Sequence, residues 1–277
     1  MKAVWQEDDV SELARNTFFG KPVLIEHLHG NLHGNLHLPP DFKDEKGHYP
    51  AVLLLHGFGG NRHEHSGLFI KAAASLARAG MVVLRFDFRG SGETGGCTRD
   101  ITIKTQMQDA HDAFDHLLGH GFVNKRAVSV IGLSFGGLTA ALLAGERKDV
   151  AALVLWEAVH DMKAVLKRLY GHLSIRAVRA RGYMQAGLIQ LGSGFFDALD
   201  EINVDAVASK YTGPVLLVQG VEDTVVPVDT AYQWKRTFSQ TEAEVDLIQD
   251  ADHAFTHDVW AWNAIDRTVA WLQRALC

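Results

Sequence analysis

The fold is decided by one stretch, Val128-Ser129-Val130-Ile131-Gly132-Leu133-Ser134-Phe135-Gly136-Gly137. A run of β-branched apolar residues leads into Gly-x-Ser-x-Gly-Gly, and residues 138–144 continue as a helix-forming segment. A strand that turns sharply into a helix exposes the serine hydroxyl above the carboxyl edge of a sheet. Gly132 and Gly136 lie two positions on either side of Ser134, where a side chain would collide as strand and helix approach. The stretch therefore predicts a nucleophile elbow with Ser134 as the nucleophile.

Composition and charge exclude several classes of function. The chain has 277 residues, of which 47% are hydrophobic and 22% charged, as expected for one large globular α/β domain. A net charge of −6 offers no positive field to a nucleic acid, and no run of about eighteen apolar residues predicts a membrane span. The acidic N-terminal segment lacks the apolar core that a secretory signal needs. Two cysteines, Cys97 and Cys277, are too few for a disulfide framework. We therefore expect a cytoplasmic protein that acts on a small molecule, without nucleic acid or membrane as a partner.

Strands and helices alternate through most of the chain. An antiparallel strand pair is expected over residues 23–38, with a turn near Gly30-Asn31. Buried strands are predicted at 51–55, 81–86, 127–131, 151–156, 214–219 and 245–248, and helices at 68–79, 103–117, 138–144, 229–238 and 262–276. This order is typical of strand–helix–strand units on a mostly parallel sheet, so the expected fold class is α/β. The last helix should bury a stripe formed by Trp262, Ile265, Val269, Leu272 and Leu276.

The alternation is interrupted after Trp156. From Glu157 to about Lys210 no order of strands and helices is readable, and glycines recur. Because this segment is far longer than an ordinary connection, we predict an insertion. The expected organisation is a core domain of residues 1–157 and 204–277 with an inserted cap of residues 158–203.

Histidines in the first strand pair raise the alternative of a metal site. Histidines occupy odd-numbered positions there and leucines occupy even-numbered ones. The histidines are His27, His29, His33 and His37, and the leucines are Leu28, Leu32, Leu36 and Leu38. Alternation between the two faces of a sheet explains this spacing, and no acidic or cysteine partner completes a recognisable metal site. We predict neither a metal site nor a cofactor.

Reactive residues follow the predicted strands at the edge where open parallel sheets bind ligands. The glycine-rich loop His56-Gly57-Phe58-Gly59-Gly60 follows strand 51–55, and the backbone N–H of Phe58 is a candidate donor to an anion. Asp223 follows strand 214–219, and His253 follows strand 245–248. Together with Ser134 they give the chain order serine, acid, histidine.

These motifs resemble those of the α/β-hydrolase family over nearly the whole chain, from about Val23 to Leu276. The chain is most similar to small esterases that act on cinnamoyl and feruloyl esters, and more broadly to serine-aminopeptidase-type hydrolases. The resemblance rests on His56-Gly57-Phe58, Asp87-Phe88-Arg89-Gly90-Ser91-Gly92, Gly132-Leu133-Ser134-Phe135-Gly136-Gly137, Asp223 before Val225-Val226-Pro227, and Asp252-His253-Ala254-Phe255. It implies a mostly parallel central sheet flanked by helices, with a small inserted cap. Leu133 departs from the pattern, since many relatives carry histidine there, and we expect altered packing near the elbow without loss of activity.

The resemblance implies a role for each residue that elementary chemistry supports. His253 would take the proton of Ser134 during attack on an acyl carbon, and Asp223 would hold the imidazole tautomer. The backbone N–H groups of Phe58 and Phe135 would form the oxyanion hole. The expected substrate-binding residues are His56 and Gly57 in the glycine-rich loop, and Tyr170, Tyr183, Met184, Leu188 and Phe195 in the cap.

The expected activity is hydrolysis of small to medium carboxylic esters, including hydroxycinnamoyl or other aryl esters, through an acyl-enzyme. A thioesterase or an acyltransferase would use the same triad. A serine aminopeptidase would need carboxylates in the cap, whose first half is instead basic, with Lys163, Lys167, Arg168, Arg176, Arg179 and Arg181. A hydrolase-fold binding protein without activity is a further alternative, although such proteins commonly lose a triad member. A homodimer and a monomer are both open.

Overall fold

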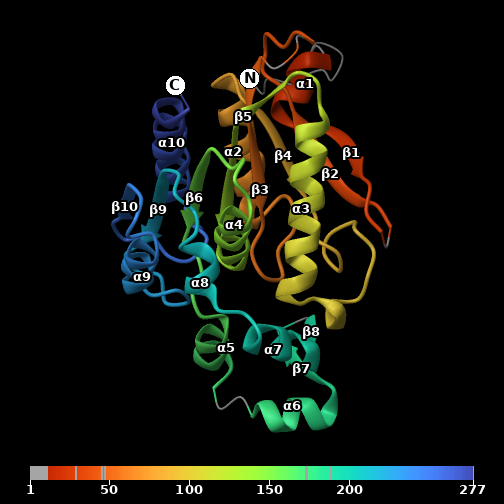
Figure 1. The fold of residues 1–277 in the computed structure, drawn as a ribbon, viewed down its shortest axis with the longest axis vertical. Helices are drawn as coiled ribbons and strands as arrows, with labels where there is room; N and C mark the ends of the chain where they lie inside the picture. Colours follow the sequence, from red (N-terminus) through yellow and green to blue (C-terminus); the bar gives the residue numbers. More distant parts are fainter. Residues whose placement is uncertain are drawn as a thin grey trace, which may run out of the picture.

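A computed structural model describes residues 12–28, 30–44, 46, 48–171, 174–187 and 189–276. One sheet of eight strands has the order β1-β2-β4-β3-β5-β6-β9-β10. Its strands are β1 Lys21–Ile25, β2 Leu32–His37, β3 Tyr49–Leu55, β4 Val82–Phe86, β5 Val123–Leu133, β6 Ala152–Trp156, β9 Val215–Gly220 and β10 Ala243–Ile248. All neighbours from β4 to β10 pair in parallel, and β2 pairs antiparallel with β1 and β4. The mostly parallel α/β sheet predicted from the sequence is confirmed (Figure 1).

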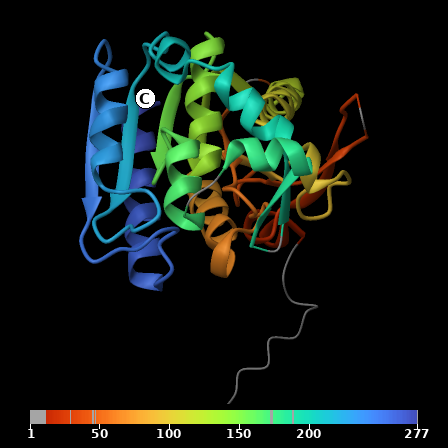
Figure 2. The ribbon, with the colours of Figure 1, turned by 90° about the horizontal axis from the view of Figure 1, so that it is seen from below.

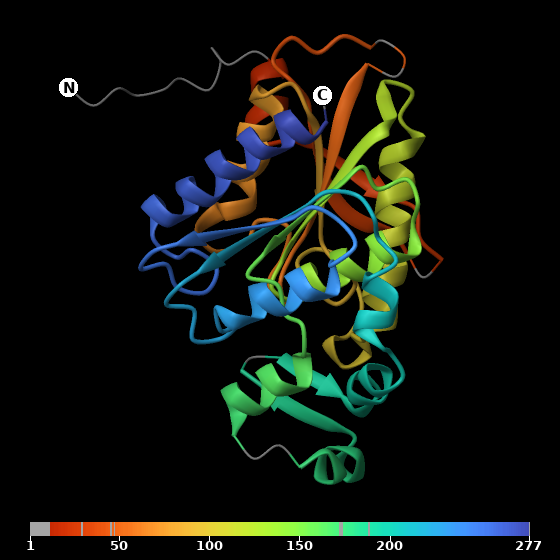
Figure 3. The same cartoon turned by 60° about the vertical axis from the view of Figure 1, so that its left-hand side comes forward.

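Helices cover both faces of this sheet, as Figure 3 shows. On one face pack α2 Leu68–Arg78 and α10 Asp258–Ala275, which share an apolar core with the sheet. On the other face pack α3 Ile103–Gly119, α4 Phe135–Glu146, α8 Val204–Ala208 and α9 Asp229–Thr237, which contribute to a second apolar core. A short helix, α1 Glu12–Phe18, packs on α2. Because β5 lies between these two cores, its apolar run is continuous and does not alternate.

The first strand pair departs from the expected alternation. β1 and β2 do pair antiparallel, with Ile25 opposite Leu32. However, Leu28 lies beyond the end of β1 with an exposed fraction of 88%, and His37 is buried although it was expected on the polar face. The cost of burying that ring is offset because its Nε2 accepts a hydrogen bond from Arg85 and its Nδ1 donates one to the carbonyl oxygen of Thr17. His29 lies outside the described residues.

The buried face of the last helix also differs from the expected stripe. Trp262 is 40% exposed, while Ile265 and Leu272 are buried as expected. The remaining buried positions of α10 are Ala261, Ala264, Thr268 and Trp271. The buried face therefore includes the small residues at 261 and 264 and leaves Trp262 on the exposed side of the helix.

The segment after β6 has regular structure that the sequence did not reveal. It contains α5 Met162–Tyr170, α6 Ile175–Arg181, β7 Tyr183–Ala186, β8 Ile189–Gly192 and α7 Ser193–Asp200. β7 and β8 form a separate antiparallel hairpin. These elements lie together beyond one end of the large sheet in Figure 1, and Figure 2 shows the molecule from that end. Since α5 follows β6 directly, this is the end where the parallel strands finish at their carboxyl termini.

Among the helices of the described residues, none combines the length and the apolar character that a bilayer crossing requires.

Candidate active site

Ser134 lies at the junction of β5 and α4 in a strained backbone conformation. Its φ and ψ angles are 55° and −116°, a region that residues with a side chain rarely adopt. The close approach of the two elements leaves no room for side chains at the flanking glycines. A Cβ on Gly132 would stand 2.3 Å from the carbonyl oxygen of Gly136, and one on Gly136 would stand 2.2 Å from that of Leu55. The local sequence therefore positions the Ser134 side chain at the carboxyl edge of the sheet.

His253 connects Ser134 to Asp223 through two hydrogen bonds. Its Nε2 lies 3.1 Å from Oγ of Ser134, and its Nδ1 lies 2.7 Å from Oδ2 of Asp223. An ionised carboxylate can only accept, so Nδ1 carries the proton in this arrangement and Nε2 is left to accept from the serine hydroxyl. The structure thus brings the predicted serine, histidine and acid together within hydrogen-bonding distance.

Asp223 is fixed by its own loop. It is 5% exposed, and its Oδ1 accepts hydrogen bonds from the backbone N–H groups of Val225 and Val226, each at 2.8 Å. Its Oδ2 accepts a further bond from the side-chain amide of Gln219 at 3.2 Å. These donors hold the carboxyl in place and fix the oxygen that faces the imidazole.

The loop after β3 lies against the serine. A Cβ on Gly57 would stand 3.4 Å from Cβ of Ser134. Among the described residues, no acceptor pairs with the backbone N–H of Phe58 or of Phe135, the first residue of α4. Both N–H groups are therefore available to an oxyanion, although their role stays a prediction.

His56 lies behind this loop and not in front of it. It is 1% exposed, and its Nε2 accepts a hydrogen bond of 3.1 Å from the N–H of Phe88. Its Nδ1 lies 2.9 Å from the carbonyl oxygen of Gly57 and donates to it. Burial lowers the pKa of this imidazole, so it remains a neutral link between the loops after β3 and β4. Contact of His56 with substrate, as expected from the sequence, stays a prediction.

The predicted substrate-binding residues of the cap have different surroundings. Phe195 is fully buried, with its ring centroid 6.0 Å from that of Phe58 and 5.6 Å from that of Phe135. Two guanidinium groups contact the Tyr183 ring, with Arg99 at 4.3 Å and Arg181 at 4.4 Å from the ring centroid. Tyr170 is 42% exposed and Met184 is 7% exposed. Leu188 lies outside the described residues.

A cavity of about 390 Å³ opens beside His253. Its lining consists of Phe58, Gly59, Gly60, Asn61, Glu64, His65, Leu133, His253 and Ala254. A more open hollow of about 770 Å³, lined by polar residues such as His160 and Asp205, includes none of Ser134, Asp223 and His253. The smaller cavity is the better candidate for substrate because it borders both His253 and the Phe58 loop.

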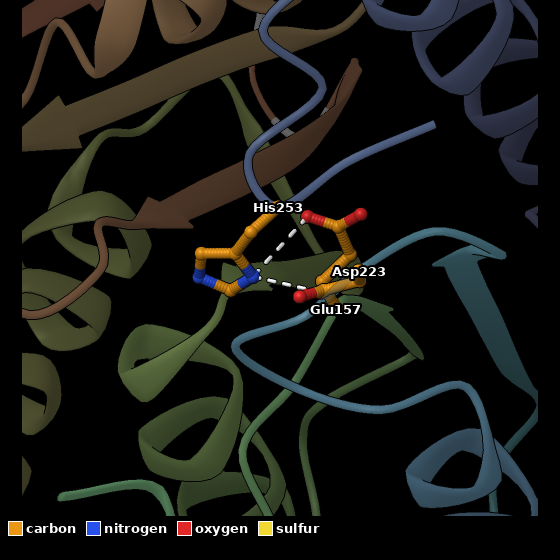
Figure 4. Close-up of side chains that lie close together, drawn as sticks. All are labelled: Glu157, Asp223 and His253. Atoms are coloured by element: carbon orange, nitrogen blue, oxygen red, sulfur yellow. Dashed lines mark hydrogen bonds and ion pairs between the residues drawn. The ribbon is translucent and has the colours of Figure 1, made fainter. Parts of the chain in front are cut away.

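Glu157 is a site residue that the sequence did not reveal. It follows β6 and has φ of 46° and an exposed fraction of 0%. Its Oε2 lies 3.6 Å from Nδ1 of His253, on the same side of the imidazole as Asp223 (Figure 4). Burial, and then repulsion from the Asp223 charge, raise the pKa of Glu157 well above 4.5. The position of Glu157 directly after a buried strand could have indicated a site residue. It was overlooked because the expected cap begins at the next residue.

Glu157, Asp223 and His253 also form a group with metal-ligand atoms within 4.8 Å of one another. The hydrogen bonds explain their proximity without a metal. His253 donates to Asp223, and both oxygens of Glu157 accept from backbone N–H groups.

The sequence of residues 68–277 matches the profile of the prolyl oligopeptidase family. The structure is similar to that of Est1E from Butyrivibrio proteoclasticus with ferulic acid bound, with a TM-score of 0.81, 21% identity and coverage of 91% of this chain and 98% of that one. At this identity, the likeness establishes the shared α/β-hydrolase fold.

Two curated relatives differ in their named activities. Acylamino-acid-releasing enzyme 2 of Oryza sativa subsp. japonica is 24% identical over 218 residues, which are 75% of this chain and 28% of that protein. A thermostable monoacylglycerol lipase of Bacillus sp. is 25% identical over 237 residues, which are 79% of this chain and 88% of that protein. This chain covers only 36% to 63% of the length of four other curated relatives that it matches.

Proposed function

The chain belongs to the prolyl oligopeptidase family of serine hydrolases and has the α/β-hydrolase fold, and on this premise we propose that it hydrolyses carboxylic esters through an acyl-enzyme on Ser134. The observation that carries the proposal is the hydrogen-bonded series from Oγ of Ser134 through His253 to Asp223. The series is already hydrogen-bonded, and Asp223 is fixed by the N–H groups of Val225 and Val226, so the arrangement needs little reorganisation before reaction.

The proposed reaction has two halves with the same proton carrier. Oγ of Ser134 attacks the acyl carbon while Nε2 of His253 removes its proton, and the carbonyl oxygen accepts hydrogen bonds from the N–H groups of Phe58 and Phe135. The C–O bond to the alcohol then breaks, and Nε2 returns the proton to the leaving oxygen. Water attacks the acyl-enzyme by the same route and releases the acid. Asp223 keeps the proton of Nδ1 in place and offsets the positive charge of the imidazolium.

The proposed substrates are small to medium esters with a planar acyl group. The rings of Phe58, Phe135 and Phe195 pack against one another, and Phe58 lines the cavity beside His253, where an aromatic wall favours a flat apolar ligand. Est1E, which shares the fold, has ferulic acid bound in its solved structure. In this proposal, residues 158–203 form an inserted cap over the acyl site, because they follow β6 at the carboxyl edge of the sheet.

A serine peptidase is the second candidate. Glu64 lines the cavity beside His253, and a carboxylate in such a place favours a substrate with a free amine. Two cationic residues of the cap do not oppose this, because Lys163 pairs with Asp200 and Arg179 pairs with Asp197. The name of the family and that of the rice relative favour a peptidase, whereas the name of the Bacillus lipase favours an esterase.

A substrate panel distinguishes these candidates. Purified protein and its Ser134→Ala variant would be assayed with p-nitrophenyl acetate, methyl hydroxycinnamates, an acyl-thioester and aminoacyl p-nitroanilides. We expect Ser134-dependent turnover of the first two, with kcat/KM at least about 10-fold above that for the anilides. Faster cleavage of aminoacyl anilides would favour the peptidase, and equal turnover by the alanine variant would contradict both.

A further inference from the structure

His253 faces two buried carboxyl groups where the reaction requires one. Glu157 follows β6 and Asp223 follows β9, and these strands are parallel neighbours in the sheet. Their following residues therefore meet at one edge, and both carboxyl groups approach Nδ1 of the imidazole, at 3.6 Å and 2.7 Å (Figure 4). A second carboxyl beside a histidine is expensive to bury unless it has polar partners.

Glu157 has such partners, and they belong to the two loops that carry the histidine and the acid. Its Oε1 accepts a hydrogen bond of 3.2 Å from the N–H of Gly220, at the end of β9. Its Oε2 accepts one from the N–H of Ala254, the residue after His253. The contact with β9 is so close that a Cβ on Gly220 would stand 2.6 Å from Oε1. One side chain therefore ties the His253 loop to the Asp223 loop.

The backbone of Glu157 is itself held in an unfavourable conformation. Its φ of 46° is uncommon for a residue with a long side chain. Its N–H donates to the carbonyl oxygen of Val218 at 2.8 Å, which continues the pairing of β6 with β9. Strain of this kind persists where surrounding contacts over-determine the conformation, and it concentrates at functional sites.

The charged groups around Glu157 decide its protonation. Asp223 and Asp252 are negative neighbours, His253 is the titratable neighbour, and the N–H groups of Gly220 and Ala254 are donors. Burial and the Asp223 charge raise the pKa of Glu157 more than the two donors lower it. Two carboxyl groups in one site resist a second negative charge, and the raised pKa of Glu157 favours its neutral form.

We propose that Glu157 is a positioning residue for His253, which holds the histidine loop against the acid loop and replaces Asp223 as the acceptor of the Nδ1 proton when Asp223 is removed. This inference rests on the proposed role of His253 as general base. Removal of the Asp223 charge also removes one cause of the raised pKa of Glu157, so the remaining carboxyl ionises more readily. The 3.6 Å separation between Oε2 of Glu157 and Nδ1 of His253 is within ion-pair distance.

A double-variant cycle tests the exchange of roles. In a triad without a second acid, asparagine at the acid position lowers kcat about 10⁴-fold. We expect Asp223→Asn to lower kcat only about 10- to 100-fold, Glu157→Gln about 10-fold or less, and the double variant about 10⁴-fold. Asp223→Asn with Glu222→Gln is the matched control, because Glu222 is an exposed carboxyl one residue away, and it should match Asp223→Asn alone. A loss of about 10⁴-fold in Asp223→Asn, with no further loss in the double variant, would overturn the proposal.

A spectroscopic readout separates this inference from the proposed function, because it needs no substrate. An Nδ1–H bound to a carboxylate gives a low-field proton resonance. It should persist in Asp223→Asn and disappear when Glu157→Gln is added, whereas its loss in Asp223→Asn alone would contradict a second acceptor. If the wild-type protein proved inactive on every ester, this signal would still decide the role of Glu157.

Thermal unfolding shows whether a variant is folded. If Glu157→Gln does not fold, the low-field resonance of Asp223→Asn decides between the two outcomes alone.

Discussion

At the scale of single residues, Ser134 shows how the backbone supports chemistry. Its strained conformation persists because β3, β5 and α4 pack so closely that positions 132 and 136 accept no side chain. The carbonyl oxygen of Leu55 occupies the space that a larger residue at 136 would need. The glycines of the elbow are therefore required by packing, and the serine is required by reaction.

Substitution of Gly136 measures this requirement. Gly136→Ala places a Cβ 2.2 Å from the carbonyl oxygen of Leu55, which backbone atoms must move to relieve. We expect a loss of about 3 kcal/mol or more in the free energy of unfolding, measured by urea denaturation. Gly119→Ala at the end of α3 is the control, since nothing lies within 4 Å of its Cβ, and it should change stability by less than about 1 kcal/mol. Equal effects of the two substitutions would contradict the packing account.

His37 makes the stability of the fold dependent on pH. Its Nε2 accepts a hydrogen bond of 2.8 Å from Nε of Arg85, and its Nδ1 lies 3.1 Å from the carbonyl oxygen of Thr17 and donates to it. Burial, together with the Arg85 charge, lowers the pKa of His37 from 6.5 to about 3. Below pH 6.5 the imidazole of His37 is protonated in the unfolded chain but stays neutral in the folded chain. The contribution of His37 to the free energy of unfolding is therefore fully present above pH 6.5 and is lost as the pH falls toward about 3.

The slope of stability against pH tests this assignment. Between pH 6.5 and 4.5 a single such histidine contributes up to about 1.4 kcal/mol per pH unit. His37→Gln should lower the stability at pH 7 but flatten the slope by roughly this amount in urea unfolding at pH 6.5, 5.5 and 4.5. His33→Gln, at a side chain that is 43% exposed, is the control and should keep the wild-type slope. An unchanged slope in His37→Gln would show that the buried imidazole is not neutral.

At the scale of secondary-structure elements, the β7–β8 hairpin is joined to the core through the loop that follows β4. Arg99 lies in this loop, and its Nε donates to Oε1 of Gln190 at 2.7 Å while its guanidinium covers the Tyr183 ring. A Cβ on Gly192 would stand 2.3 Å from the carbonyl oxygen of Arg99. The hairpin therefore lies directly on the loop, and Ile189 reaches the glycine-rich loop at Gly59.

Removal of the Arg99 side chain should loosen the hairpin without unfolding the protein. These contacts are exposed, so Arg99→Ala should lower the unfolding free energy by about 1 kcal/mol or less. We expect KM for a methyl hydroxycinnamate to rise several-fold while KM for p-nitrophenyl acetate stays within about twofold, because only the larger acyl group needs the hairpin in place. Lys71→Ala, which removes an ion pair between α2 and α10, is the control. Equal changes for both substrates would argue against a role of the hairpin in acyl selection.

The elements that the sequence predicted are those with a long, uniform environment. Buried parallel strands such as β3 and β6 read as apolar runs, and α2 and α3 show a clear helical period. The hairpin and the short helices after β6 were missed because each contributes only a few apolar residues, which pack against one another and the core loops. Leu28 and Trp262 were assigned to buried faces wrongly, since periodicity alone does not locate the end of a strand or the centre of a stripe.

At the scale of the whole molecule, the parallel sheet explains why residues far apart in sequence meet. Ser134, Glu157 and Asp223 each follow a strand, and His253 lies shortly after the last strand. The order of these strands in the sheet brings β5, β6, β9 and β10 side by side. The proximity of serine, acid and histidine was therefore predictable from the ends of the strands. The contacts of Phe195 and the hydrogen bonds of Glu157 to the N–H groups of Gly220 and Ala254 depend on side-chain packing that no local sequence pattern encodes.

The central claim is that Ser134 is the nucleophile and that His253 activates it. The most direct measurement is covalent labelling with a fluorophosphonate, followed by peptide mass spectrometry of the wild-type, Ser134→Ala and His253→Ala proteins. We predict one adduct per chain on Ser134 in the wild-type protein, none in Ser134→Ala and labelling slowed at least about 100-fold in His253→Ala. An adduct on another residue, or unchanged labelling of a folded Ser134→Ala protein, would contradict the account.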